Sequence, residues 1–188
     1  MRFSGIVGGD EIRTMPMASR SILRLSWLAP NLILSVGAAL VILVFDDAIE
    51  RFATLAMLLP VVANVSGCSG NQSVAVSIRE LSLGIIQPQD FMRVLRQELF
   101  LGMANGAVLG VILGALTYLI AKKSGLGIVV GIALALNTTV AVLLGAAIPL
   151  LLKRVGIDPA AGAAPMLTTI VDMCGFIFIL GLVSTFLM

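Results

Sequence analysis

The 188-residue sequence contains no histidine and few charged residues. Without histidine, this chain by itself cannot build a Ser-His-Asp triad, a histidine zinc site or an imidazole proton relay. Only 12% of its residues are charged, whereas soluble domains usually carry about 25%. Its two cysteines, Cys68 and Cys174, lie in apolar stretches and form neither a CxxC motif nor a disulfide framework. Too few polar side chains remain to coat a water-soluble globule, so we expect most of the chain to lie in lipid.

Long apolar runs are what the sequence has instead, and hydrophobic residues make up 59% of it. The five runs cover about residues 25–45, 52–82, 98–121, 125–152 and 164–187. Each can cross a bilayer as a helix at about 1.5 Å per residue, and none shows the alternation of a barrel strand. The sequence therefore predicts an all-α integral membrane protein. A short cytosolic segment, 1–24, without a cleavable signal peptide, leads into a five-helix transmembrane domain, 25–188.

The distribution of Lys and Arg predicts the orientation. With a cytosolic N-terminus, the inside segments hold nine of them: Arg2, Arg13, Arg20, Arg24, Arg79, Arg93, Arg96, Lys153 and Arg154. The outside loops hold three: Arg51, Lys122 and Lys123. Positive charge is enriched on the cytosolic side of membrane proteins, so we expect the N-terminus inside and the C-terminus outside.

Small residues mark one face of the third run. Its glycines recur every four residues, at Gly102, Gly106, Gly110 and Gly114. This spacing places them on one side of a helix, where they allow another helix to approach closely in lipid. We expect these residues to serve helix packing.

The most informative residue is Asp172, near the middle of the fifth run. An ionisable group at that depth costs roughly 2.5–3.5 kcal/mol on insertion scales and usually marks an ion or proton path. Apart from Arg79 at the end of the second run, no Lys or Arg lies within the runs to neutralise it. Residues at helical spacing place a hydroxyl and open space on the same stripe: Pro165, Thr168 or Thr169, and Gly175. The alternative is a protonated carboxyl that only joins helices by hydrogen bonds.

Polar residues also interrupt the second run. The candidates for lining a path are Asn64, Ser66, Gly67, Gly70, Asn71 and Gln72. Polar or irregular segments at membrane depth are tolerated where they face protein or a water-filled cavity. We therefore expect this segment to line a cavity, with hydrogen bonding between helices as the alternative. For Asn137, Thr138 and Thr139 in the fourth run, that alternative weighs equally.

The available ligand atoms are hard oxygens, which suit Mg²⁺, Ca²⁺ or Mn²⁺ better than zinc or copper. One carboxylate in each chain carries too little negative charge to balance a divalent ion. A two-fold homodimer would place two Asp172 side chains across one axis and double the charge. We therefore expect a homodimer with a pore on the two-fold axis. The net charge of +2 gives no sign of nucleic-acid binding.

Several segments resemble the transmembrane domain of the MgtE family of magnesium transporters. They are Gly8-Gly9-Asp10-Glu11, Ser66-Gly67-Cys68-Ser69-Gly70-Asn71-Gln72, Arg79 with Leu81–Gly84, and Asp158-Pro159-Ala160 with Pro165, Thr168, Thr169, Asp172 and Gly175. The last group is the most specific. Cys68 stands where the family usually has Asn, and Ser66 replaces a Gly.

This resemblance implies a homodimeric, magnesium-selective channel in which Asp172 binds a hydrated ion on the dimer axis. It also implies Mg²⁺ as the transported ion, with Ca²⁺ or Mn²⁺ as possible substitutes. We expect this chain to lack the cytosolic regulatory domains that are usual in the family.

The function expected from the sequence is divalent cation transport without enzymatic activity, most simply magnesium uptake across a bacterial inner membrane. Two alternatives stay open. One is a scaffold subunit of a larger complex that transports nothing. The other is a carrier for another divalent cation, such as Ca²⁺, Mn²⁺ or Co²⁺.

Overall fold

The computed structural model describes residues 6–7, 10–11 and 16–188 and is helical almost throughout. A two-residue strand pair, β1 (Ile6–Val7) and β2 (Asp10–Glu11), precedes the helices. The helices are α1 (Met17–Val44), α2 (Asp46–Arg51), α3 (Thr54–Leu83), the 3-10 helix η2 (Pro88–Asp90), α4 (Phe91–Ala121), α5 (Ser124–Arg154) and α6 (Pro159–Leu187). The expected all-α class is confirmed. Gly8 and Gly9, the start of the first family-like segment, lie outside the described residues.

Four of the described helices, α1, α4, α5 and α6, are long and apolar enough to cross a membrane. Helix α3 has 30 residues, but polar side chains such as Asn64, Asn71 and Gln72 interrupt its apolar surface. Length and composition therefore identify four candidate spans among the described helices, and α3 does not meet these two criteria.

Two helices begin earlier than the apolar runs suggest. Helix α1 begins at Met17, directly after Pro16, although the segment up to residue 24 was expected to precede the first span. Helix α6 begins at Pro159 and not near residue 164, because the Asp158 side chain accepts a 3.0 Å hydrogen bond from the Ala160 amide. An acidic N-cap followed by proline is a strong helix start.

Helix α4 also begins before the expected residue 98. The left-handed backbone of Gly84 (φ 73°) ends α3, and η2 begins after a short connection. The backbone N–H of Gln87 donates a 2.9 Å hydrogen bond to the Asp90 carboxylate. Helix η2 then continues directly into α4 at Phe91. The starts of these helices therefore differ from the starts of the apolar runs. Helix ends depend on the groups that cap the backbone, and charged residues can lie inside the helix.

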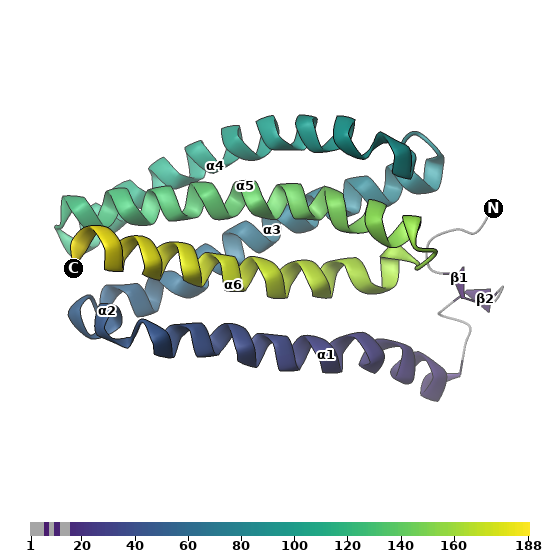
Figure 1. Cartoon of the computed structure of the whole chain (residues 1–188), viewed down its shortest axis with the longest axis horizontal. Helices are drawn as coiled ribbons and strands as arrows, with labels where there is room; N and C mark the ends of the chain where they lie inside the picture. Colours follow the sequence, from purple (N-terminus) through teal and green to yellow (C-terminus); the bar gives the residue numbers. More distant parts are fainter. Residues whose placement is uncertain (1–5, 8–9, 12–15) are drawn as a thin grey trace.

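The long helices lie side by side along the long axis of the molecule (Figure 1). The start of α1, the α3–α4 connection and the α5–α6 connection lie at one end. Helix α2, the α4–α5 connection and the C-terminus lie at the other. The basic residues of the described chain are divided between these two ends. Three lie at the second end: Arg51, Lys122 and Lys123. Seven lie toward the first end: Arg20, Arg24, Arg79, Arg93, Arg96, Lys153 and Arg154. Arg2 and Arg13 lie outside the described residues.

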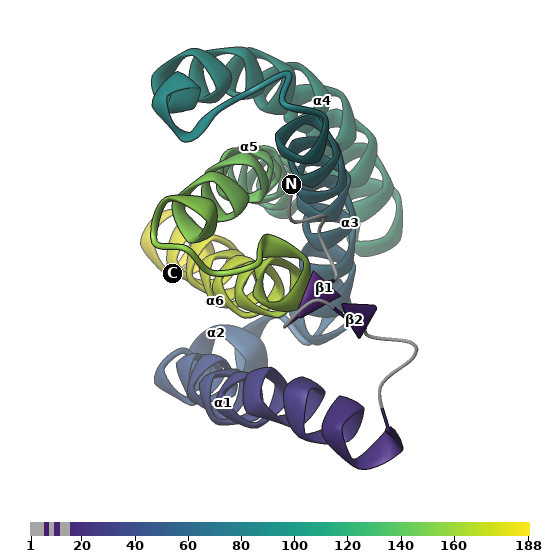
Figure 2. The same ribbon diagram turned by 90° about the vertical axis from the view of Figure 1, so that its right-hand side faces the viewer.

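Helix α5 occupies the centre of the bundle and contacts α3, α4 and α6 (Figure 2). Of its most apolar stretch, 56% is buried, whereas the corresponding share of α1 is 6%. Helix α1 packs mainly on α6 and leaves most of its surface exposed.

Close backbone contact joins α4 to α5. The expected glycine row of α4 (Gly102, Gly106, Gly110 and Gly114) faces α5 along its whole length. A Cβ atom added at Gly106 would lie 2.6 Å from the carbonyl oxygen of Ala135, and one at Gly114 would lie 2.8 Å from that of Gly127. Such distances leave no room for a side chain, so glycine is required for this approach.

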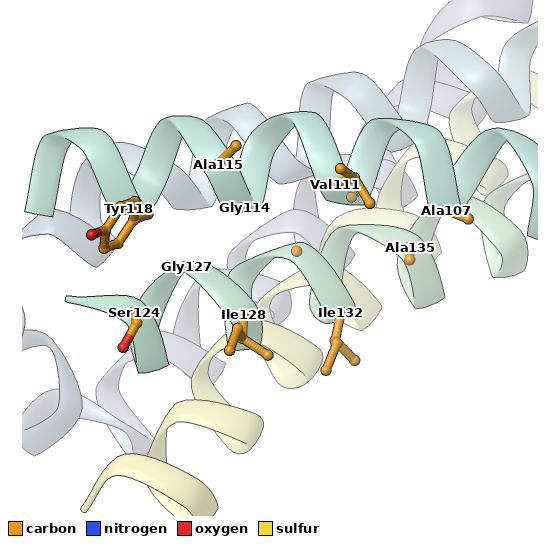
Figure 3. Close-up of a pocket in the computed structure, with 12 residues that line it drawn as sticks. Ala107, Val111, Gly114, Ala115, Tyr118, Ser124, Gly127, Ile128, Ile132 and Ala135 are labelled. Carbon is orange, nitrogen blue, oxygen red and sulfur yellow. The ribbon is translucent and has the colours of Figure 1, made fainter. Parts of the chain in front are cut away.

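Beside this contact runs a groove of about 590 Å³ between the two helices (Figure 3). Gly114 and Gly127 meet at its floor, and Val111 and Ile128 are among its lining residues. Its lining is apolar apart from the hydroxyls of Tyr118 and Ser124. It therefore offers no carboxylate to a cation.

Helix α3 also approaches α5 through small residues, on a face of α5 next to the one that meets α4. A Cβ atom at Gly70 would lie 2.8 Å from the carbonyl oxygen of Ala141, and one at Gly145 would lie 2.9 Å from Cβ of Ser73. Helix α5 is thus held between two neighbours through small residues.

We predict that Gly106→Ala destabilises the bundle, because the new methyl group meets the rigid α5 backbone at Ala135. Overpacking of this kind costs about 1–3 kcal/mol. Thermal unfolding in detergent should show a lower midpoint than the wild type. Gly181→Ala in α6 is the matched control, because a Cβ atom there meets nothing within 4 Å. Equal midpoints for the two variants would contradict the proposed contact.

Candidate functional site

Asp172 lies in the middle part of α6 and is half-buried. Within the described part of the chain, no hydrogen bond or ion pair holds its carboxylate, and no group of three His, Cys, Asp or Glu residues could hold a metal ion. A single chain therefore presents one unpaired carboxylate at this depth. Burying a charge without a partner is costly unless water or another protein group reaches it.

The turn before Asp172 is tied to α1. The buried hydroxyl of Thr169 donates a hydrogen bond to Oδ1 of Asn31. The hydroxyl of Thr168 donates to the carbonyl oxygen of Ala164 at 3.0 Å, within α6 itself. Beside this link is a hollow of about 440 Å³, lined by Ser26, Pro30, Asn31, Leu34, Pro165 and Met166.

The turn after Asp172 faces α5 and α3. A Cβ atom added at Gly175 would lie 2.7 Å from Nδ2 of Asn137 and 3.6 Å from Cγ1 of Val62. Asn137 is fully buried, and within the described part of the chain neither of its amide atoms has a hydrogen-bond partner. An unpartnered buried polar group costs roughly 1–3 kcal/mol.

These two turns define the direction of Asp172. Residues three apart on an α-helix differ by about 60° in direction. Since Thr169 points toward α1 and Gly175 toward α3 and α5, Asp172 points between them. Its half-buried carboxylate therefore lies on the side of α6 between α1 and α3.

The polar residues of α3 divide into two faces. Ser66, Gly70 and Ser73 are buried toward α5, where Oγ of Ser66 lies 3.4 Å from Oγ1 of Thr138. The sequence predicted Ser66 and Gly70 as lining candidates, and the structure places both residues against α5. Gly67 is buried as well, although a Cβ atom there would meet nothing within 4 Å.

The opposite face of α3 is polar and exposed. It carries Asn64, Cys68, Asn71 and Gln72, which recur at helical spacing. The Cys68 thiol lies 4.0 Å from Oδ1 of Asn64. These three amides and one thiol form a surface that lipid tails do not solvate. Protein or water must therefore contact it.

Asn31 and Glu98 are polar residues that the sequence analysis did not single out. Glu98 lies in α4 and accepts a 2.7 Å hydrogen bond from the buried hydroxyl of Ser73. Asn31 was visible as an amide within an apolar run, which is the same signal that identified Asp172. Its partner on α6 is 138 residues away in sequence, so no local pattern could reveal the pair.

The family model and the curated relatives that match this chain all carry the name MgtE. The MgtE family, described as "Divalent cation transporter", matches residues 59–182. The chain is 30% identical over 140 residues to "Magnesium transporter MgtE" of Enterococcus faecalis, covering 73% of this chain and 31% of that protein. It is 29% identical over 164 residues to the Bacillus subtilis protein of the same name, covering 87% and 36%.

A third relative, "Magnesium transporter MgtE" of Thermus thermophilus, is 30% identical over 95 residues, which is 50% of this chain and 21% of that protein. The chain thus spans about a third or less of these curated relatives. The family match covers most of α3 through α6, including Asp172 and the small-residue contacts of α5. On this evidence the chain is an integral membrane protein and belongs to the MgtE family of divalent cation transporters.

Proposed function

We propose that this chain forms the membrane-spanning unit of a magnesium transporter, in which Asp172 binds the hydrated ion. The observation that carries this proposal is the half-buried carboxylate of Asp172, which no described residue pairs. Mg²⁺ dehydrates reluctantly and is usually bound by one or two carboxylates while it keeps several waters. The curated relatives that bear the name of magnesium transporters support the choice of ion.

The proposed unit is a homodimer with a channel-like pore on its two-fold axis. Two Asp172 carboxylates would together balance the charge of one divalent cation, which a single chain does not do. The exposed polar face of α3 supports the same arrangement, because Asn64, Asn71 and Gln72 need a polar neighbour at membrane depth. In the dimer this face would meet water at the subunit boundary, with Pro165 and Thr168 near the ion.

We propose α3 as the fifth span. It runs alongside the transmembrane helices α5 and α6 and connects the two ends of the bundle (Figure 1). The polar side chains of α3 lower its mean hydropathy. Two that are buried form hydrogen bonds with other helices: Ser66 with Thr138 of α5, and Ser73 with Glu98 of α4. With the excess of Lys and Arg at the first end, the N-terminus faces the cytosol and the C-terminus faces outward. The bacterial relatives favour the inner membrane as the location.

We predict that Asp172→Asn lowers Mg²⁺ flux into proteoliposomes at least about tenfold, equivalent to roughly 1.4 kcal/mol of barrier. The substitution keeps the shape of the side chain and removes its charge. A Mg²⁺-sensitive dye inside the liposomes measures the flux, and cross-linking checks the dimer. Glu50→Gln is the matched control, because Glu50 is an exposed carboxylate of α2 at the far end of the bundle. Undiminished flux in both Asp172→Asn and Asp172→Ala would overturn the proposal.

Cys68 offers an independent test of the polar face of α3. In a Cys174→Ala background, a charged, membrane-impermeant methanethiosulfonate reagent should label Cys68 from water and reduce Mg²⁺ flux. The physical reason is that thiols react as thiolates, which requires contact with water. Cys68→Ser in the same background provides the unlabelled control. Labelling only by an apolar, membrane-permeant maleimide would show that this face meets lipid, against the proposed pore.

A further inference from the structure

The amide of Asn137 is an unusual buried group. It lies on α5 with no exposed surface, and both Oδ1 and Nδ2 lack a hydrogen-bond partner within the described part of the chain. The hydroxyl of Thr117 on α4 is the other buried polar atom of this kind among the described residues. Native structures keep few such groups, and each calls for an explanation.

The amide lies where three helices meet. Val62 of α3 and Gly175 of α6 are its neighbours, and Nδ2 takes the position that a side chain at residue 175 would need. The next residue, Thr138, is paired with Ser66 of α3 at 3.4 Å. The junction therefore contains one unpartnered amide and two hydroxyls within an otherwise apolar layer.

The position of Gly175 brings this junction close to Asp172. Side chains three residues apart on a helix have Cβ atoms about 5–6 Å apart. Helical side chains also lean toward the N-terminus, so the space at Gly175 lies over the turn that carries Asp172. Since Nδ2 of Asn137 lies 2.7 Å from the Cβ position of residue 175, the amide lies within about one helical turn of Asp172.

We propose that Asn137 is a positioning residue for ion transport: its amide holds a buried water that orients the Asp172 carboxylate. This inference rests on the proposed function of Asp172. A buried water typically makes about three hydrogen bonds to polar groups that lack other partners. The amide of Asn137 supplies a donor and an acceptor, and the carboxylate of Asp172 supplies further acceptors. Groups that orient a metal ligand are often worth about tenfold or more in metal affinity or activity.

The decisive variant is Asn137→Leu, which keeps the approximate size of the side chain and removes both unpartnered atoms. If Asn137 positions Asp172, this variant should unfold about 2–4 °C higher than wild type yet need about tenfold more Mg²⁺ for half-maximal flux. Asn137→Ser, which keeps a hydroxyl and leaves room for water, should recover part of the loss. Thr117→Val is the matched control, because it removes the other unpartnered group and should gain stability without changing the Mg²⁺ dependence.

The outcomes separate the two proposals. Wild-type Mg²⁺ dependence in Asn137→Leu, together with loss of flux in Asp172→Asn, would overturn the role of Asn137 and leave the proposed function intact. A parallel loss of flux and thermal stability in Asn137→Leu, without recovery in Asn137→Ser, would assign the amide a structural role and overturn the inference. Full flux in both Asp172→Asn and Asp172→Ala would overturn the proposed function first.

Discussion

Backbone contact through glycine is the interaction on which this fold depends. Helix α5 meets α4 at Gly106 and Gly114 and meets α3 at Gly70, and in each case a carbonyl oxygen of α5 lies where a side chain would otherwise be. In lipid the hydrophobic effect does not drive helices together, so dispersion forces from close packing must do so. Because these contacts occur on two sides of α5, that helix becomes the centre of the bundle.

The same packing decides which polar groups are free to act. The face of α3 that meets α5 buries Ser66 and Ser73 in hydrogen bonds with other helices. The opposite face leaves Asn64 and Gln72 exposed. A membrane domain of this kind uses part of its polarity to join helices, and the remainder is available for water and ions.

Some features could be predicted because they depend on local chemistry. The apolar runs predicted the helices, since about 20 apolar residues are needed to cross a bilayer core. Asp172 was evident because a carboxylate in lipid is costly wherever the helix points. Helix starts were less predictable, because capping by Asp158 and by the Gln87–Asp90 pair lies outside the apolar runs. The direction of each polar side chain depends on contacts between distant segments, so the sequence did not reveal that Ser66 and Gly70 contact α5.

The sequence by itself therefore determined the solvent, the helical class and the one ionisable residue deep in an apolar helix, because each follows from composition and period along a single segment. Only the tertiary structure decided that Thr169 pairs with Asn31, that Asn137 faces Gly175, and that α3 has a packed and an exposed polar face. These facts depend on which helix lies beside which. That choice is set by how closely whole surfaces fit, which no stretch of sequence states alone.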